Sequence, residues 1–250
     1  MIKKLVFVFA ALCFSLTAVS CGRSAADKAL LDKRSDLKQL NMPQKGDQIA
    51  IIDTSMGKIK MRLFAEYTPE AVENFVALAE AGYYNDILFH RVKENFIIQS
   101  GDPTGTGRGG DSATGLPIKR ELVKELHHIR GAVAMARTDE NVSQRSQFYI
   151  VQNHDLREDL ADELRRYLDN PDEVISDGDP PLLRRDAFPP DILSKYLEVG
   201  GAPHLDYNNT VFGQVYEGMD VVDKIARLET DENDKPIKDV IVKSIKIVKY

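Results

Sequence analysis

The sequence predicts a mainly β domain in which about eight antiparallel strands are flanked by two helices. Three observations lead to this prediction. Many short segments alternate apolar with polar residues or are wholly apolar, turn-forming residues separate them, and after residue 46 amphipathic helical spacing occurs at only two places outside a central insert. Periodicity alone gives this antiparallel β-rich class and does not decide whether the sheet closes.

The first two strands are expected at residues 48–53 and 58–64, on either side of a tight turn that contains Gly57. In the second segment Ile59 and Leu63 belong to an apolar set that alternates with basic residues, so one face of that strand is expected in the core. Further strands are expected at residues 131–136, 147–151, 211–216 and 240–248.

Two amphipathic helices are expected to flank the sheet. The first should begin at Thr68 and Pro69 and end near Gly82, because proline suits the first helical turn and apolar residues recur at helical spacing behind it. The second is expected at residues 219–228.

The stretch at residues 89–102 carries the candidate site. Two apolar runs, residues 87–89 and 96–98, are expected to form adjacent strands joined by a turn. Arg91 and Gln99 close these runs, so a hairpin would place a guanidinium and an amide on one face. The result would be an apolar pocket with a cationic rim, although an ordinary hairpin with an exposed arginine fits the same pattern.

Five motifs follow one another along the chain. They are Phe89-His90-Arg91 with Phe96 and Gln99 behind it, Met135-Ala136-Arg137, Ser146-Gln147-Phe148-Tyr149-Ile150, His204-Leu205-Asp206 and Val211-Phe212-Gly213. In content and order they resemble the signature of the cyclophilin-type peptidyl-prolyl isomerases. The resemblance implies a closed antiparallel eight-stranded β-barrel capped by two α-helices.

The same resemblance implies roles for individual residues. Arg91, Phe96 and Gln99 would be catalytic. The substrate-binding residues would be Ile97, Ala136, Arg137, Gln147, Phe148, Tyr149, His204, Leu205 and Asn209, with Phe148 at or behind the socket for the proline ring. The chain departs from the family pattern at Tyr149, where phenylalanine is commoner, at Asn209, where histidine or tyrosine is usual, and at His204, where many members carry tryptophan.

The implied activity is peptidyl-prolyl cis-trans isomerisation of exported proteins, without a cofactor. Amide resonance sets a barrier of about 18–20 kcal/mol to rotation. A donor such as Arg91 that stabilises the twisted amide, beside an apolar socket for the proline ring, would accelerate rotation without a covalent step. The alternative is a cyclophilin-fold binding or chaperone module with little or no turnover.

Residues 152–203 form an insert that the family motifs do not cover. Leucines recur every fourth residue from Leu156 to Leu168, and a second helical pattern runs from Pro190 to Gly200. The sequence therefore predicts a helical excursion that begins and ends beside the pocket. Because it lies outside the motifs, its replacement by a short turn is expected to leave a folded barrel.

Other kinds of site are disfavoured. The glycine-rich run at residues 105–110 resembles a phosphate-binding loop, but no helix opens after it, so a tight loop beside the pocket is expected instead. The adjacent His127 and His128 would face opposite ways on a strand, and no metal site is expected. A serine hydrolase is disfavoured because Ser100 lacks the nucleophile-elbow motif.

The first residues resemble an export signal. Two lysines precede an apolar run that is too short to span a bilayer, and Ala18-Val19-Ser20-Cys21 resembles a bacterial lipoprotein cleavage box; ordinary signal cleavage nearby is the alternative. The expected organisation is a signal peptide at residues 1–20, a lipidated Cys21 with a tether and short helix to residue 46, and a cyclophilin-like domain at residues 47–250. The protein is expected to face the periplasm as a membrane-anchored monomer.

The amino-acid composition limits the classes of partner that the protein is expected to bind. The chain has 33 basic against 39 acidic residues and a net charge of −6, which argues against nucleic acid. Cys13 lies in the segment expected to be removed, so Cys21 would be the lone cysteine of the mature protein and no intramolecular disulfide could form. The expected partners are proline-containing polypeptides and, through the lipid, a membrane.

The anchor gives a first prediction. The Cys21→Ala variant should lose processing at that site and leave the membrane fraction, because two or three acyl chains are needed for stable attachment. Fractionation and mass spectrometry of the mature N-terminus measure both effects. An unmodified mature N-terminus at another position would contradict the prediction.

Overall fold

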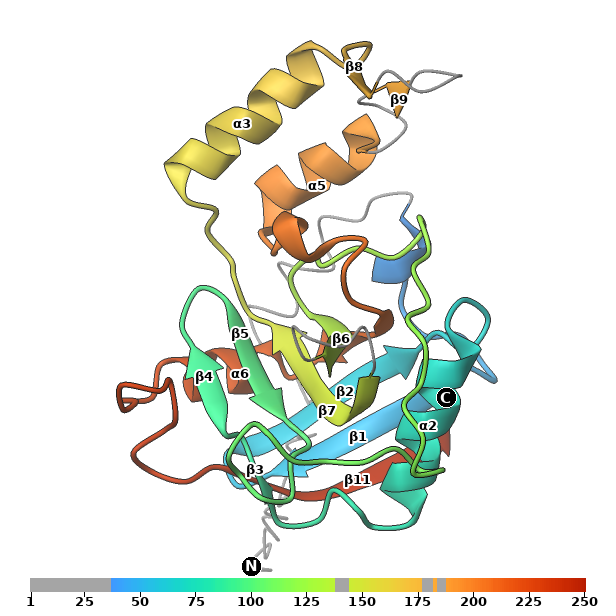
Figure 1. Ribbon diagram of the computed structural model, residues 1–250, viewed down its shortest axis with the longest axis vertical. Coiled ribbons are helices and arrows are strands. Elements are labelled where there is room, and N and C mark those ends of the chain that lie inside the picture. Colours follow the sequence, from blue (N-terminus) through green and yellow to red (C-terminus); the bar gives the residue numbers. More distant parts are fainter. Residues whose placement is uncertain (1–36, 138–143, 177–181, 184–187) are drawn as a thin grey trace, which may run out of the picture.

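A computed structural model describes residues 37–137, 144–176, 182–183 and 188–250 (Figure 1). Its main feature is one curled antiparallel sheet of nine strands in the order β3-β11-β1-β2-β10-β6-β7-β5-β4. The strands are β1 (Gln48–Thr54), β2 (Gly57–Leu63), β3 (Ile87–Leu88), β4 (Arg91–Lys93), β5 (Ile97–Ser100), β6 (Ala132–Arg137), β7 (Gln144–Val151), β10 (Val211–Glu217) and β11 (Ile241–Lys249). The antiparallel β-rich class predicted from periodicity is confirmed.

The predicted closed eight-stranded barrel is wrong in both respects, because the sheet has nine strands and is open. Its two edges, β3 and β4, are consecutive pieces of one segment that is interrupted at Phe89 and His90. Within the described residues, β3 pairs only with β11 and β4 only with β5. The curl thus brings the two edge strands, β3 and β4, to one stretch of chain. Within the described residues these two strands do not pair with each other.

Both edge strands are short, and one outward-facing backbone group of each has a hydrogen-bond partner. The hydroxyl of Ser100 donates to the carbonyl oxygen of Leu88 in β3 at 2.9 Å. The amide of Val92 in β4 donates to the carbonyl oxygen of Asp234 at 2.7 Å. The loop before β11 therefore covers the edge of β4, next to Arg91.

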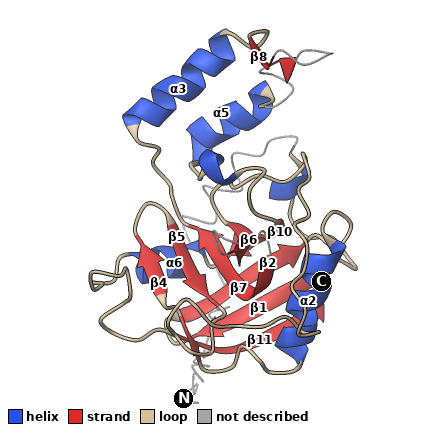
Figure 2. Cartoon of the chain, viewed as in Figure 1, coloured by secondary structure: helices blue, strands red, loops and turns tan. Residues whose placement is uncertain are grey.

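The two predicted flanking helices are α2 (Pro69–Glu80) and α6 (Met219–Ala226). They lie at opposite ends of the curled sheet, with α2 against β7 and β11 and α6 against β2, β4 and β5 (Figure 2). The carboxylate of Glu121 accepts hydrogen bonds from the amides of Glu70 and Ala71, so a distant loop caps the start of α2. No helix of the described residues is long and apolar enough to cross a membrane.

Buried side chains form two clusters, one on each face of the sheet. We call the first face the core face: it carries Ile98, Phe148 and Ile150, which pack with α2, α6 and the opposite side of the curl. We call the second the pocket face: it carries Ile97 and Tyr149 in a smaller cluster. Because side chains alternate along a strand, neighbouring residues of β5 and β7 serve different faces.

The insert forms a separate layer above the sheet in Figure 1. It contains α3 (Glu158–Asp169) and α5 (Pro190–Val199), as predicted, and a strand pair β8 (Val174–Ser176) and β9 (Leu182–Leu183) that was not predicted. Of the helix expected in the tether, the structure describes the short 3-10 turn η1 (Lys38–Leu40), and residues 21–36 of the tether lie outside the described residues.

The insert is fastened to the domain at its base. The side-chain amide of Asn153 donates to the carbonyl oxygen of Gly201 at 2.7 Å, and a Cβ on Gly200 would lie 2.5 Å from the carbonyl oxygen of Asn153. Only glycine permits that approach. In addition, Leu193 and Tyr196 of α5 belong to the same buried cluster as the core face of the sheet. The expectation that the insert could be replaced without loss therefore conflicts with the packing of α5.

This packing predicts the cost of truncating α5. Leu193 is 1% exposed, so Leu193→Ala should reduce the free energy of unfolding by about 2–5 kcal/mol. Leu197→Ala, at a partly buried position of the same helix, is the matched control and should cost less. Urea unfolding measures both. Equal, small losses would show that α5 is not part of the cooperative core.

Candidate functional site

Strand register brings three predicted site residues into one row. Arg91 of β4 lies opposite Gln99 of β5, and Gln99 lies opposite Tyr149 of β7. Residues that face each other across antiparallel strands project from the same side of the sheet. A guanidinium, an amide and an aromatic ring therefore stand side by side on the pocket face.

The hairpin that carries Arg91 differs from the predicted one. Its strands are residues 91–93 and 97–100, whereas residues 87–88 pair with β11. Asn95 adopts a left-handed conformation with φ of 57°, and its amide donates to the side chain of Gln152 at 2.8 Å. Asparagine tolerates this conformation better than most residues, and the turn leaves Phe96 beside the start of β5.

A pocket of about 420 Å³ opens beside this row. Nine predicted residues line it: Arg91, Phe96, Ile97, Gln99, Ala136, Arg137, Tyr149, Leu205 and Asn209. Four other lining residues were not predicted, namely His90, Thr106, Gly107 and Asn233. His90 stands inside the quoted Phe-His-Arg motif and could have been proposed from it, whereas no sequence signal points to Asn233.

Arg91 lies at the rim of the pocket. Its Nε donates to Oδ2 of Asp234 at 3.3 Å, and its guanidinium carbon lies 5.9 Å from the centre of the Phe96 ring. The side chain is 39% exposed, so the ion pair is a weak one, but it defines the direction of the guanidinium. Among the described residues we find no hydrogen bond that uses the two terminal nitrogens, which leaves them available to a ligand.

Gln99 is fixed by a relay of amides. Its Nε2 donates to Oε1 of Gln147 at 2.8 Å, and Nε2 of Gln147 donates to the carbonyl oxygens of Gly107 and Gly109 at 3.0 and 2.7 Å. Gln147 is therefore not a lining residue but a support between Gln99 and the glycine loop.

The glycine loop binds a carboxylate of its own chain. Asp102 accepts hydrogen bonds from the amides of Thr104, Thr106 and Gly109 at 2.8 to 3.1 Å. A Cβ on Gly109 would lie 2.3 Å from Oδ1 of Asp102, so the loop requires glycine there. Burial would raise the pKa of Asp102, but hydrogen bonds from the hydroxyl and the amide of Thr104 and from the amide of Gly109 lower it below its usual value. The prediction of a tight loop beside the pocket agrees with this geometry.

Besides Gln147, two predicted substrate-binding residues lie away from the lining. Phe148 is fully buried on the core face, where its ring packs edge-on against Phe75 of α2 at 5.5 Å, so it cannot touch a bound peptide. Its neighbour Tyr149 takes the pocket face because side chains alternate along β7. His204 stacks on the outer side of Phe96, with ring centres 5.6 Å apart, and burial lowers its pKa.

The remaining predicted residues form the far wall. Ala136 and Arg137 end β6. Leu205 ends the 3-10 turn η2 (Pro203–Leu205), and the side-chain amide of Asn209 donates to the carbonyl oxygen of Met135 at 3.0 Å. Asn209 therefore ties this wall to β6. Cys21, the predicted lipidation site, lies outside the described residues.

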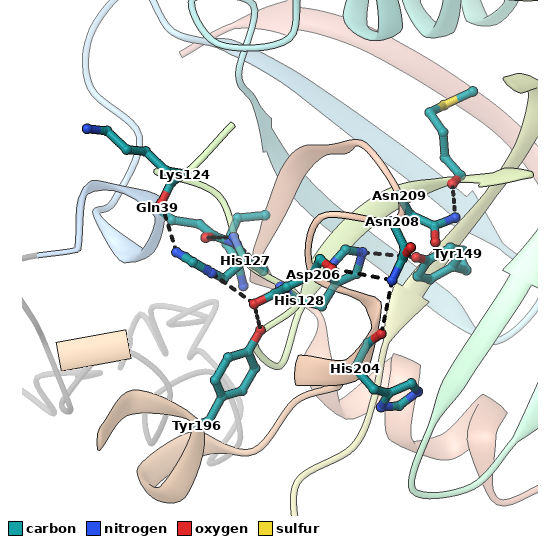
Figure 3. Close-up of polar contacts among 12 residues, drawn as sticks. Gln39, Lys124, His127, His128, Tyr149, Tyr196, His204, Asp206, Asn208 and Asn209 are labelled. Carbon is teal, nitrogen blue, oxygen red and sulfur yellow. Dashed lines mark hydrogen bonds and ion pairs between the residues drawn. The ribbon is translucent and has the colours of Figure 1, made fainter. Parts of the chain in front are cut away.

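Asp206, which belongs to the motif His204-Leu205-Asp206 but was assigned no role from the sequence, is a buried carboxylate behind the pocket (Figure 3). Asp206 accepts hydrogen bonds from Nδ1 of His127 at 2.9 Å and from Nδ1 of His128 at 2.8 Å. The two histidines thus converge on one group instead of facing opposite ways, because their segment is irregular and not a strand. Nε2 of His127 lies 2.9 Å from the carbonyl oxygen of Lys124, so both nitrogens of that ring face acceptors.

The charge of Asp206 is stabilised by these donors. Burial alone would raise its pKa, but the hydrogen bonds from His127 and His128 outweigh burial and hold the pKa well below its usual range. The carboxylate is therefore ionised at neutral pH. Among the described residues no group of three or more histidine, cysteine or acidic side chains could hold a metal ion.

Comparisons with known proteins agree with one another. The family model described as "Cyclophilin type peptidyl-prolyl cis-trans isomerase/CLD" matches residues 49–247. A relative from Staphylococcus saprophyticus, named as a peptidyl-prolyl cis-trans isomerase, is 39% identical over 211 residues, which are 84% of this chain and 97% of the relative. A relative of the same name from Staphylococcus epidermidis is 36% identical over 210 residues, covering 84% and 96%.

Solved structures give the same result. A cyclophilin-type peptidyl-prolyl cis-trans isomerase of Cryptosporidium parvum superposes with a TM-score of 0.60 at 28% identity and covers 82% of this chain and 99% of its own. The same protein, solved in the presence of the dipeptide Ala-Pro, gives a TM-score of 0.59 at 27% identity, with 81% and 99% covered.

Asp206 gives a prediction about stability. Asp206→Asn should lower the free energy of unfolding by about 3–5 kcal/mol at pH 7, because it leaves buried donors without their charged acceptor. The pKa of Asp206 is lower in the folded than in the unfolded state, where it is about 3.9. The carboxylate's contribution is thus fully present above pH ~4. It declines as the pH falls below that value, and the difference between the two proteins should shrink.

Urea unfolding of both proteins between pH 7 and pH 3 measures this effect. Asp220→Asn is the control: it removes an exposed carboxylate that pairs with Lys224 at 2.8 Å and should cost less than about 1 kcal/mol. Equal losses from the two substitutions at pH 7 would contradict the prediction.

Proposed function

The chain belongs to the cyclophilin-type peptidyl-prolyl cis-trans isomerase family, and from that premise we propose that the pocket beside Arg91 binds prolyl peptides and accelerates rotation about their X-Pro bonds. The observation that carries the proposal is the row of Arg91, Gln99 and Tyr149 along this pocket. The Ala-Pro dipeptide present with the Cryptosporidium parvum protein supports a prolyl ligand.

The reaction needs a catalyst that favours a twisted amide over both planar forms. Trans is preferred over cis by only about 0.5–1 kcal/mol at an X-Pro bond, whereas the barrier is about 18–20 kcal/mol because rotation breaks amide resonance. Resonance loss returns electron density to the prolyl nitrogen. A preorganised donor near that nitrogen, or near the carbonyl that rotates, therefore stabilises the transition state more than the ground states.

Arg91 is the donor in this mechanism. Its Nε donates to Asp234, and its two terminal nitrogens remain available for a ligand at the rim of the pocket. The proline ring would occupy the apolar part of the pocket between Phe96, Ile97 and Leu205. Since a held ring cannot follow the rotation, the preceding residue turns while the ring stays fixed.

Gln99 holds the peptide backbone next to the ring. One N–H of its Nε2 is donated to Gln147, which orients the amide, and its Oε1 can accept from a peptide N–H. The support that Gln147 receives from Gly107 and Gly109 keeps this acceptor in place. Noncovalent positioning of this kind needs no cofactor.

We further propose that the substrates are exported proteins and that the enzyme is a lipid-anchored monomer facing the periplasm. The support is the sequence alone: an apolar leader ends at Cys21, and the chain carries a net charge of −6 that gives it no general attraction to an anionic surface. Anchoring would then depend on the lipid.

The role of Arg91 can be tested by its kinetics. Arg91→Ala should lower kcat/KM by about 10²- to 10³-fold, the cost typical of one preorganised donor, while peptide affinity falls much less. Arg91→Lys should recover little, because a flexible point charge does not reproduce a planar fork. Isomerisation of a short proline peptide and its binding are measured for each variant.

Phe96→Ala is the matched comparison. Because the socket holds the ring in ground and transition states alike, this variant should lose affinity and turnover together. A folded Arg91→Ala protein with nearly full activity would remove Arg91 from the mechanism. A wild-type protein that binds prolyl peptides without turnover would favour a binding or chaperone module.

A further inference from the structure

A chain of buried polar contacts runs from the insert to the pocket (Figure 3). The hydroxyl of Tyr196, in α5 of the insert, donates to Oδ2 of Asp206 at 2.7 Å. Oδ1 of Asp206 accepts from Nδ1 and from the backbone amide of His128, both at 2.8 Å. Nε2 of His128 lies 3.0 Å from the hydroxyl of Tyr149, whose ring lines the pocket.

Every member of this chain is shielded from water. The side chains of His128 and Asp206 are 1% exposed, Tyr196 is fully buried, and Tyr149 is 4% exposed. Hydrogen bonds without competing water are stronger, and loss of one leaves its partner unsatisfied. The rings of His128 and Tyr149 are also stacked, 6.0 Å apart and inclined by 19°, so the contact constrains the ring plane as well as the hydroxyl.

The direction of each hydrogen bond follows from the carboxylate. Asp206 is ionised and can only accept, so Nδ1 of His128 carries a proton. In the neutral ring Nε2 is then the acceptor, and the hydroxyl of Tyr149 donates to it. Asp206 thereby selects the tautomer of His128 that can hold Tyr149, in the way that a carboxylate orients many functional histidines.

We propose that His128 and Asp206 are positioning residues for Tyr149, and that the insert, through Tyr196, helps to set the position of this pocket wall. This inference rests on the proposed function, since it assigns a role within the same pocket. It gives the hydroxyl of Tyr149 a purpose: a phenylalanine at this site could not be tied to His128. It also gives α5 a part in substrate binding although Tyr196 does not line the pocket.

Pairwise substitution tests the inference. Tyr149→Phe should raise the KM for a proline peptide by about 2- to 10-fold, the range expected from one net hydrogen bond. Tyr196→Phe should raise KM in the same direction. In the double variant Tyr196→Phe should add nothing, because the hydroxyl through which it acts is gone. Partial unfolding lowers the apparent kcat but leaves KM unchanged, so KM is the decisive quantity.

Tyr167→Phe is the control. It removes a hydroxyl from the other helix of the insert, where the group bonds to Glu163 of its own helix, and it should leave KM unchanged. If Tyr196→Phe raised KM by the same factor in the wild-type protein and in the Tyr149→Phe variant, the proposal would be overturned. An unchanged KM in Tyr196→Phe alone would overturn it as well.

A second measurement does not depend on turnover. In ¹⁵N NMR of labelled histidine, His128 should show a protonated Nδ1 and an unprotonated Nε2. Tyr196→Phe should shift the His128 resonances, and Tyr167→Phe should not. Identical His128 spectra in wild type and Tyr196→Phe would overturn the inference even if the wild-type protein proved inactive, whereas inactivity together with the expected shifts would contradict only the proposed function.

Discussion

The register between β4, β5 and β7 is the constraint on which the pocket depends. A slip by one residue would turn each side chain to the opposite face of the sheet. The register is pinned from the core side, where Ile98 and Phe148 are fully buried. Their neighbours Gln99 and Tyr149 must then project the other way and meet Arg91. Packing that never touches a ligand thus determines which residues a ligand meets.

Local patterns in the sequence were enough for most elements. Alternation along residues 58–64 and the proline at the start of α2 are signals that neighbouring residues carry by themselves, and both elements formed as predicted. Nine of the twelve predicted catalytic and substrate-binding residues line the pocket, because they stand in motifs whose spacing matches the strand register. Phe148 was predicted at or behind the socket, and the alternation along β7 places it behind the socket, on the core face.

The features that could not be predicted from the sequence depend on contacts between distant segments. Whether the sheet closes depends on the interruption at Phe89 and His90, which divides one segment into β3 and β4. An interruption of two residues has no periodic signature in the sequence. Asp234 meets Arg91 across 143 residues, and Asp206 meets His128 across 78. The histidine pair was judged as though it lay on a strand. In the irregular segment where it lies, both rings can reach one carboxylate.

The edges of the open sheet have a consequence for solubility. An open sheet exposes backbone donors and acceptors that can recruit a strand from another molecule, and this is a common route to aggregation. Here β3 and β4 have two and three residues, and Ser100 and Asp234 occupy outward-facing groups of each. Peptidyl-prolyl isomerases of this family act on proline-containing peptides, and such peptides are often extended segments. Edges of this kind offer such segments few free backbone groups, so the sheet is protected from pairing edge to edge with the peptides that the enzyme binds.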